Sequence, residues 1–326
     1  MAKKKLDRQK SDALSTFQPE ETAAESEQAY HVPVLLQESI DALQIKPDGV
    51  YVDCTFGGGG HSRAVLARLN ENGRLYAFDQ DEDARRNLPD DSRVVFIQQN
   101  FRHIRRFLRL ENIKAVDGIL ADLGVSSHQF DEADRGFSIR YDAEMDMRMD
   151  RKQVHTAYEV VQNYTEAQLH KLFEQFGEVT NAKTLAKTIV AVRNTVSLKT
   201  IDGFKNALRA VVKGNPNKYF AQVFQALRME VNEEVQVLKE MLEQAASLLH
   251  PGGRIAVITF HSIEDRIVKR FFKEGSFEEI VDHPFTNEQK EAVFKIITKK
   301  PIVAQQDELR RNTRSRSAKL RVAEKR

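Results

Sequence analysis

The sequence predicts an α/β fold in which a mostly parallel, twisted sheet carries helices on both faces and is interrupted by an all-helical insertion. Three observations support this prediction. A short apolar strand runs into a glycine turn and then into a helix at 50–66. Further apolar strands alternate with segments of helical periodicity. The stretch 151–213 has helical periodicity alone, and the strand pattern resumes after it.

The first strand and its turn read V-Y-V-D-C-T-F-G-G-G-G-H from Val50 to His61. The glycines at 57–60 lack a Cβ atom, so their backbone can adopt positive φ and approach a ligand closely. The helix that begins near His61 offers unpaired amide groups to an anion. A structural turn without a ligand is the alternative for a glycine run taken alone.

The second strand, Arg74–Phe78, is followed directly by Asp79. This acid lies roughly 20 residues beyond the glycines, where such folds place a carboxylate on the hydroxyl groups of a ribose. The pattern therefore favours a ligand that contains adenosine. The alternative is a solvated strand end, because three more acids follow at 81–83.

The third and fourth strands also end in residues suited to ligand binding. Phe101 follows the strand at 93–97, and Asp122 ends the strand at 116–122. The Phe101 ring could stack on an adenine, with a position in the core as the alternative. Ligands of open parallel sheets bind beyond the carboxyl ends of the strands. We therefore expect Asp79, Phe101 and Asp122 along one edge of the sheet.

A long polar segment at 125–150 follows the fourth strand and predicts a functional loop, because ordinary connections are shorter. It contains His128, Asp131, Glu132 and Asp134, but their spacing matches no loop that binds a hard cation. The sequence therefore predicts no metal site.

The pattern after the insertion predicts a long helix at 221–249, a strand at 254–260 and a second helix that His261 and Ser262 open. His261 is a candidate catalytic base, with a structural role in its loop as the alternative. The last strand is predicted at 293–298, before a basic tail.

Composition favours a cytoplasmic enzyme. The chain has 326 residues, of which 41% are hydrophobic, enough for a large core. No apolar run reaches membrane-spanning length, and no secretory signal is visible. Cys54 is the only cysteine, which excludes a disulfide framework and a cysteine-rich metal site.

The charge of the chain is unevenly distributed. Residues 310–326 contain eight basic residues and one acid, a charge of +7, so the total of +2 leaves −5 on the remainder. A basic tail on a mildly acidic body suggests a polyanion as partner, with a merely solubilising disordered tail as the alternative.

Six motifs occur in a fixed order along the chain: T-F-G-G-G-G-H-S, A-D-L-G-V-S-S-x-Q, R-G-F-S, M-D-M-R-M-D, F-Q-A-L-R and F-H-S-I-E-D-R-I-V-K. In this order they closely resemble the bacterial ribosomal RNA small subunit methyltransferase H family, also called MraW, over about residues 30–326. The resemblance implies a Rossmann-like core that uses S-adenosylmethionine to methylate the exocyclic N4 amine of a cytidine. It places that cytidine in the decoding region of small-subunit (16S) ribosomal RNA, within an assembled or late-assembling subunit.

The resemblance also implies roles for individual residues. By position, the cofactor contacts of the family fall on Gly59, Gly60, His61, Asp79, Phe101, Asp122 and Gln129. We expect direct in-line transfer, with Asp122, Ser126 or the backbone of the 123–127 loop orienting the target amine. Cys54 lies in the first strand as a core residue, which argues against a covalent route to a ring carbon.

The expected domains are a disordered extension at 1–29, a methyltransferase core at 30–140 and 214–302, a helical substrate-recognition insertion at 141–213, and a basic tail at 303–326. The chain departs from the family at Gly58, where an arginine is common, and at Thr313, where a proline is common. It also has Asn-Pro-Asn at 215–217, where the family often has His-Pro-Ala.

Two other classes of function share some of these features. A nucleotide-dependent oxidoreductase has the same glycine turn and acid. A non-catalytic RNA-binding or assembly factor could use the basic tail. The sequence leaves open whether the protein is a monomer or a homodimer.

Overall fold

The computed structural model describes residues 33–277 and 292–326. The extension predicted at 1–29 lies outside the described residues. Within the described part, no helix is both long and apolar enough to cross a membrane.

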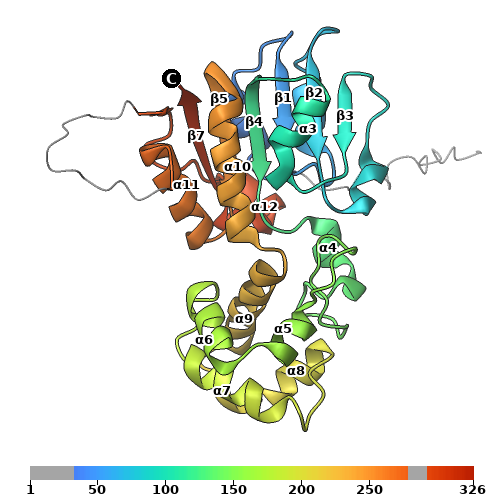
Figure 1. Cartoon of the computed structure of the whole chain (residues 1–326), viewed down its shortest axis with the longest axis vertical. Coiled ribbons are helices and arrows are strands. Elements are labelled where there is room, and N and C mark those ends of the chain that lie inside the picture. Colours follow the sequence, from blue (N-terminus) through green and yellow to red (C-terminus); the bar gives the residue numbers. More distant parts are fainter. Residues whose placement is uncertain (1–32, 278–291) are drawn as a thin grey trace, which may run out of the picture. The chain divides into compact units, whose positions relative to one another are not determined.

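A seven-stranded sheet has the order β3-β2-β1-β4-β5-β7-β6 (Figure 1). The first five strands pair in parallel, whereas β7 is antiparallel to both of its neighbours. This arrangement confirms the predicted fold class. The strands are β1 (Val50–Asp53), β2 (Arg74–Phe78), β3 (Val94–Ile97), β4 (Val116–Asp122), β5 (Leu249–Thr259), β6 (Phe294–Ile296) and β7 (Lys319–Lys325).

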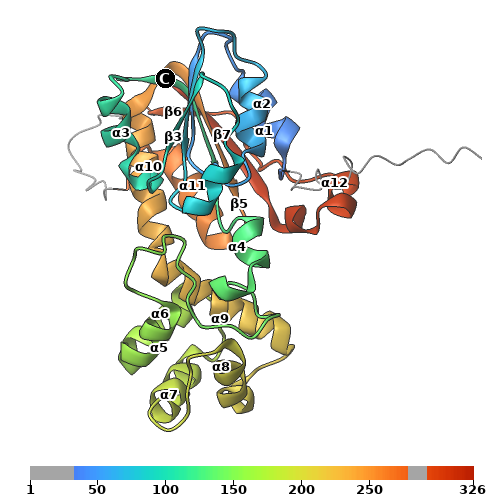
Figure 2. The same ribbon diagram turned by 90° about the vertical axis from the view of Figure 1, so that its right-hand side faces the viewer.

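Helices cover both faces of this sheet (Figure 2). Along β4, Ile119 and Ala121 pack into the core on one face, whereas Leu120 packs into the core on the other. Strands that are buried on both faces need continuous apolar sequence, which is what these strands have. One face is covered by α1 (Leu36–Leu43) and α2 (Gly60–Leu66), and the other by α3 (Ile104–Leu110), α10 (Glu234–Leu248) and α11 (Ser262–Glu274).

A second hydrophobic core belongs to the helical part of the chain. Its helices are α5 (Ala157–Asn163), α6 (Glu166–Gln175), α7 (Ala182–Val192), α8 (Ile201–Ala207) and α9 (Pro216–Val231). Thr156 and Thr165 open α5 and α6 through capping boxes, which satisfy amide groups at the helix starts. Because Tyr219, Val223 and Phe224 of α9 lie in this core, the helical unit extends beyond residue 213.

The single helix predicted at 221–249 is instead two helices, α9 and α10. The break lies at Asn232 and at Glu233, which adopts left-handed φ of 50°. The Asn232 side chain accepts a hydrogen bond from the Met149 amide and donates one to the Met147 carbonyl, both at 2.8 Å. Helical periodicity continues through 232–233, so the sequence alone did not reveal this break.

The segment predicted as a basic tail is largely ordered structure. It forms α12 (Gln306–Arg311), a 3-10 helix at Thr313–Ser317, and β7 in the sheet between β5 and β6. The prediction that the strand at 293–298 is the last one was therefore wrong. Leu320, Val322 and Ala323 are fully buried, but the charged residues between and around them hide this strand pattern.

Arg321 shows that part of the basic charge is structural. Its side chain is 8% exposed and binds both carboxylate oxygens of Asp265 on α11, at 2.6 and 3.1 Å. We expect Arg321→Ala to lower the free energy of unfolding by about 3 kcal/mol, because it leaves the largely buried Asp265 carboxylate with only the more distant Lys319, at 3.6 Å, as cationic partner. Urea denaturation measures this change. Arg310→Ala, at an exposed position of the same segment, is the control and should change stability by less than about 0.5 kcal/mol. Equal stability of the two variants would contradict the role of Arg321.

Candidate active site

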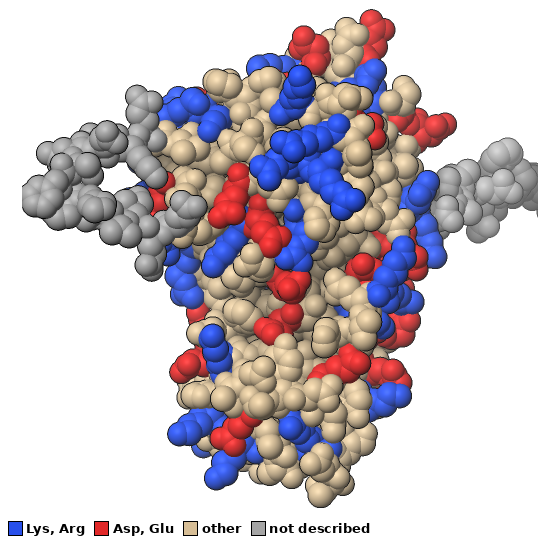
Figure 3. All heavy atoms as spheres, in the orientation of Figure 1, with Lys and Arg blue, Asp and Glu red and all other residues tan. Residues whose placement is uncertain are grey.

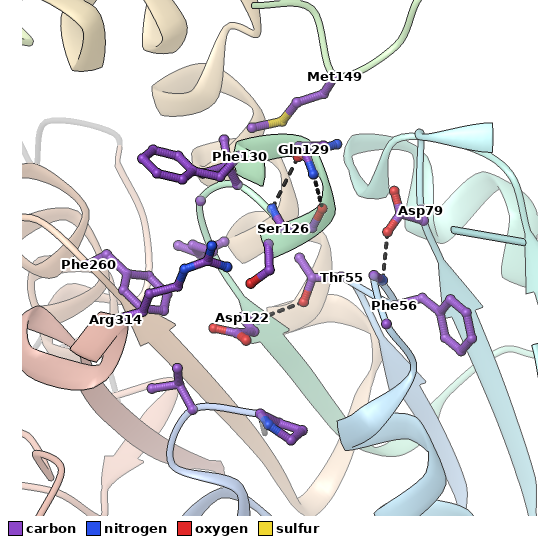
Figure 4. Close-up of a pocket in the computed structure, with 18 of the residues that line it drawn as sticks. Thr55, Phe56, Asp79, Asp122, Ser126, Gln129, Phe130, Met149, Phe260 and Arg314 are labelled. Carbon is purple, nitrogen blue, oxygen red and sulfur yellow. Dashed lines mark hydrogen bonds between the residues drawn. The ribbon is translucent and has the colours of Figure 1, made fainter. Parts of the chain in front are cut away.

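A cavity of about 590 Å³ opens at the carboxyl ends of the parallel strands (Figure 4). Its walls include residues that follow β1, β2, β3 and β4, as expected for an open parallel sheet. Seven of the predicted site residues line it: Gly60, His61, Asp79, Phe101, Asp122, Ser126 and Gln129. Gly59 and His261 are not among the lining residues.

The glycine turn has the geometry that its sequence predicts. Gly57 and Gly59 adopt left-handed φ of 49° and 72°. A Cβ atom on Gly60 would lie 2.2 Å from Pro33, so close packing also requires a glycine there. Gly59 is the residue before α2 and contributes to the turn without lining the cavity. Gly58 has open space around it and lines the cavity with backbone.

Asp79 joins the glycine turn to the end of β2. One carboxylate oxygen accepts a hydrogen bond from the Gly57 amide at 2.7 Å, and the other accepts one from the Asp81 amide at 2.9 Å. Burial raises the pKa of Asp79 from 3.8 to about 6. Each carboxylate oxygen has a second lone pair, so an ionised Asp79 can also accept hydrogen bonds from two ribose hydroxyls.

Asp122 brings a carboxylate to the cavity wall, where its side chain is 24% exposed. Its Oδ1 atom is buried and has no hydrogen-bond partner among the residues that the structure describes, so a ligand in the cavity reaches the carboxylate through Oδ2. Its backbone amide donates to Thr55 Oγ1 at 2.7 Å, which fixes the end of β4 (Figure 4). Burial, with the charges of Asp53 and Glu264, raises the pKa of Asp122 well above its usual value.

His61 lies beside Asp122. The His61 Nδ1 atom lies 3.8 Å from Asp122 Oδ2, and the His61 Nε2 atom lies 3.1 Å from the Val34 carbonyl oxygen. His61 is 5% exposed. Its contact with Val34 links the cavity wall to the segment before α1.

Ser126 and Gln129 form a capping box at the start of α4 (Ser127–Asp131). The Gln129 amide accepts from the Ser126 backbone at 3.1 Å and donates to Asp81 at 2.8 Å. Both ends of this side chain are therefore engaged in holding the loop beside the cavity. Direct contact of Gln129 with a cofactor remains a prediction.

His261 caps α11 instead of lining the cavity. Its Nε2 atom lies 3.1 Å from Glu264 Oε1, and its Nδ1 atom faces the Glu264 amide at 3.4 Å. This geometry matches the structural alternative in the sequence analysis more closely than a role as catalytic base.

The lining residues that were not predicted from the sequence include Phe130, Arg140 and Arg314. Phe130 and Arg140 lie in the loop that was expected to be functional. Arg314 lies in the basic segment near the C-terminus, and only the excess of positive charge there pointed to it.

The sheet order, the glycine turn and the acids at the ends of β2 and β4 together define a Rossmann-like methyltransferase. Comparison with known proteins agrees: the model of the MraW methylase family matches residues 28–326. The chain belongs to the MraW methylase family. This membership confirms the predicted enzyme class and S-adenosylmethionine as the cofactor, and it leaves the oxidoreductase and the non-catalytic alternatives without support.

Two relatives illustrate the extent of the similarity, and both are called Ribosomal RNA small subunit methyltransferase H. The protein from Flavobacterium johnsoniae is 54% identical over 297 residues, covering 91% of this chain and 98% of the relative. The protein from Bacteroides fragilis (strain YCH46) is 50% identical over 302 residues, covering 92% and 99%. A solved rRNA methylase from Streptococcus thermophilus aligns with 13% identity and a TM-score of 0.39, over 90% of this chain and 98% of that one, and no conclusion rests on it.

Proposed function

We propose that this enzyme methylates the exocyclic N4 amine of a cytidine in the decoding region of small-subunit ribosomal RNA. The observation that carries the proposal is similarity over nearly the whole chain to relatives named for the small-subunit ribosomal RNA. The cavity supports it, because the Asp122 carboxylate on its wall can accept a hydrogen bond from an amine. The reaction would take place in the cytoplasm, on an assembled or late-assembling small subunit.

The cofactor supplies an electrophilic methyl group on a positively charged sulfur. Asp79 would accept hydrogen bonds from its ribose, Phe101 would flank its adenine, and the backbone at 57–60 would lie along its amino-acid end. The open space beside Gly58 supports a ligand in this position.

The target base would be extruded from its surroundings to reach the cavity. Its amine is conjugated with the ring and is a weak nucleophile, so positioning and the exclusion of water must supply much of the rate. The Asp122 carboxylate would accept a hydrogen bond from the amine, and Ser126 Oγ is a second candidate for this contact. A neighbouring positive sulfur favours the ionised form of Asp122, which can then take up the proton that the methylated amine loses.

The helical unit is proposed to recognise the RNA around the target. It contains the predicted insertion at 141–213, and Met149, at its junction with the core, lines the same cavity. Positioning of the base would thus depend on both parts of the chain.

Nucleoside analysis tests the proposed function. Unmodified small subunits are incubated with the enzyme and S-adenosylmethionine carrying a labelled methyl group, and the ribosomal RNA is then digested to nucleosides. The expected product is N4-methylcytidine from the decoding region. A labelled methyl group on a ring carbon or on a ribose would refute the assignment.

A further inference from the structure

One end of the cavity is not explained by the cofactor. At the end opposite Asp79, the Arg314 side chain extends toward Ser126 and Asp122, and the Phe130 ring lies beside Arg314 (Figure 4). Arg140 also lines the cavity. We call Phe130, Arg140 and Arg314 the cationic end of the cavity.

Both arginines of the cationic end lie against the Phe130 ring. The Arg314 guanidinium carbon lies 5.5 Å from the centre of the Phe130 ring, and the Arg140 guanidinium carbon lies 5.8 Å from the same centre. Arg314 also donates to both carboxylate oxygens of Asp131, at 3.0 and 2.9 Å. The residues come from α4, from the loop after it and from the 3-10 helix near the C-terminus, so distant parts of the chain converge here.

These contacts contribute little to the stability of the fold. The side chain of Arg314 is 36% exposed and that of Asp131 is 61% exposed, and an ion pair so open to water is worth only a fraction of a kcal/mol to about 1 kcal/mol. An RNA phosphate can therefore replace the Asp131 carboxylate at small cost.

The chemistry of the cationic end fits a nucleotide better than it fits the cofactor. Two guanidinium groups disfavour the positive sulfur of the cofactor but favour the phosphates of an RNA chain. An aromatic ring with guanidinium planes beside it offers surfaces on which an unpaired base stacks. Basic and acidic residues are interspersed over most of the face in Figure 3, so overall charge does not identify an RNA site on that face. The feature that indicates an RNA site is the local arrangement of Phe130, Arg140 and Arg314 in the cavity.

We propose that the cationic end is the subsite that holds the target nucleotide, with Arg314 binding a phosphate next to the extruded base. Asp131 occupies Arg314 until the RNA phosphate displaces it. This inference rests on the proposed function, since it takes RNA as the substrate. It adds the residues that position the nucleotide to be methylated. It also adds the Asp131 carboxylate, which competes with the RNA phosphate for Arg314.

Steady-state kinetics with the full-length protein and unmethylated small subunits tests the inference. Arg314→Ala is expected to raise the KM for the subunit about tenfold, because a charge-assisted hydrogen bond to phosphate is lost. The Kd for S-adenosylmethionine, measured by calorimetry, should stay unchanged. Arg314→Lys keeps the charge but loses the forked geometry, so its KM should lie between those of the wild type and Arg314→Ala.

A matched control is Arg270→Ala. Arg270 is also partly exposed and also pairs with a carboxylate, that of Glu274, at 2.6 Å, but it lies on α11, outside both the cavity lining and the helical unit. Its loss should leave the KM for the subunit unchanged. If Arg314→Ala behaves like this control, or if it weakens cofactor binding instead, the inference is overturned.

Asp131→Ala separates recognition of phosphate from a structural ion pair. It breaks the same pair as Arg314→Ala but keeps the Arg314 guanidinium, so the KM should be unchanged or lower. An equal rise in KM for both variants would show that the pair is structural and would overturn the inference.

Failure of the proposed function gives a different result. In that case, wild-type enzyme yields no N4-methylcytidine, whereas binding of a cytidine-containing oligoribonucleotide, measured by fluorescence anisotropy, still weakens in Arg314→Ala. Normal production of N4-methylcytidine with no effect of Arg314→Ala on either measurement refutes the inference alone.

Discussion

Replacing Asp79 with alanine is expected to weaken binding of S-adenosylmethionine about 100-fold, because two hydrogen bonds from ribose hydroxyls to a charged group are lost. Asp79 lines the cavity and is held by the amides of Gly57 and Asp81, so its orientation does not depend on the ligand. Calorimetry measures the affinity, and circular dichroism verifies that the variant is folded.

Glu82→Ala is the control for Asp79→Ala. Glu82 is an exposed acid in the same acidic stretch, so its loss tests whether negative charge alone matters. Its affinity for the cofactor should equal that of the wild type. Unchanged affinity in Asp79→Ala would remove Asp79 from the binding site.

The raised pKa of Asp79 adds a dependence on pH. Because its pKa is about 6, the carboxylate becomes protonated as the pH falls below this value, and cofactor binding should weaken there. The effect on stability has the opposite sign: the ionised form is disfavoured in the cofactor-free fold, so this group contributes stability that is lost as pH rises from about 4 to about 6. Asp79→Asn should remove both effects.

Replacing Asp122 with asparagine is expected to lower kcat about 100-fold, the lower end of the range for loss of a group that accepts a proton. The same change should raise the melting temperature of the cofactor-free protein at neutral pH. Burial raises the pKa of Asp122, so its ionised form costs stability, and this cost grows as pH rises through the folded-state pKa. Single-turnover kinetics and thermal denaturation measure the two changes.

Asp117→Asn is a control from the same strand. Asp117 lies near the start of β4, away from the cavity lining, and pairs with Lys46 at 2.8 Å. Burial acts to raise the pKa of Asp117, but the hydrogen bonds from Lys46 and the Val50 amide, together with the positive charge of Lys46, outweigh it, so the net pKa is lowered. Asp117→Asn should therefore destabilise the protein at neutral pH and leave kcat unchanged. A normal kcat in Asp122→Asn would exclude Asp122 from the transfer step.

The sequence predicted the cavity well because the features that form it are local. Strands that end in Asp79 and Asp122 place these residues on one edge whenever the sheet is parallel, and the glycine turn carries its own conformational signature. Family resemblance added His61 and Gln129. The capping box that engages Gln129 depends on the actual bend of the chain after β4.

Long-range contacts were harder to predict. The pattern of β7 is masked by Lys319, Arg321 and Glu324, and its burial depends on pairing with β5 and on the ion pair between Arg321 and Asp265. Arg314 reaches the cavity only because β7 lies in the sheet and brings the preceding 3-10 helix beside α4. Local periodicity in the sequence cannot predict the contact between Arg314 and Asp131, which are 183 positions apart.

A crystal structure with S-adenosylhomocysteine and a cytidine-containing oligoribonucleotide tests the central claim most directly, since the claim concerns where donor and acceptor lie. We expect the ribose hydroxyls on Asp79, and the cytidine amine beside Asp122, facing the sulfur in the line of methyl transfer. With the methyl group added in its place on the sulfur, the amine should lie about 3–3.5 Å from it. A cofactor bound with its ribose at the cationic end, or a base amine that does not reach Asp122, would contradict the account.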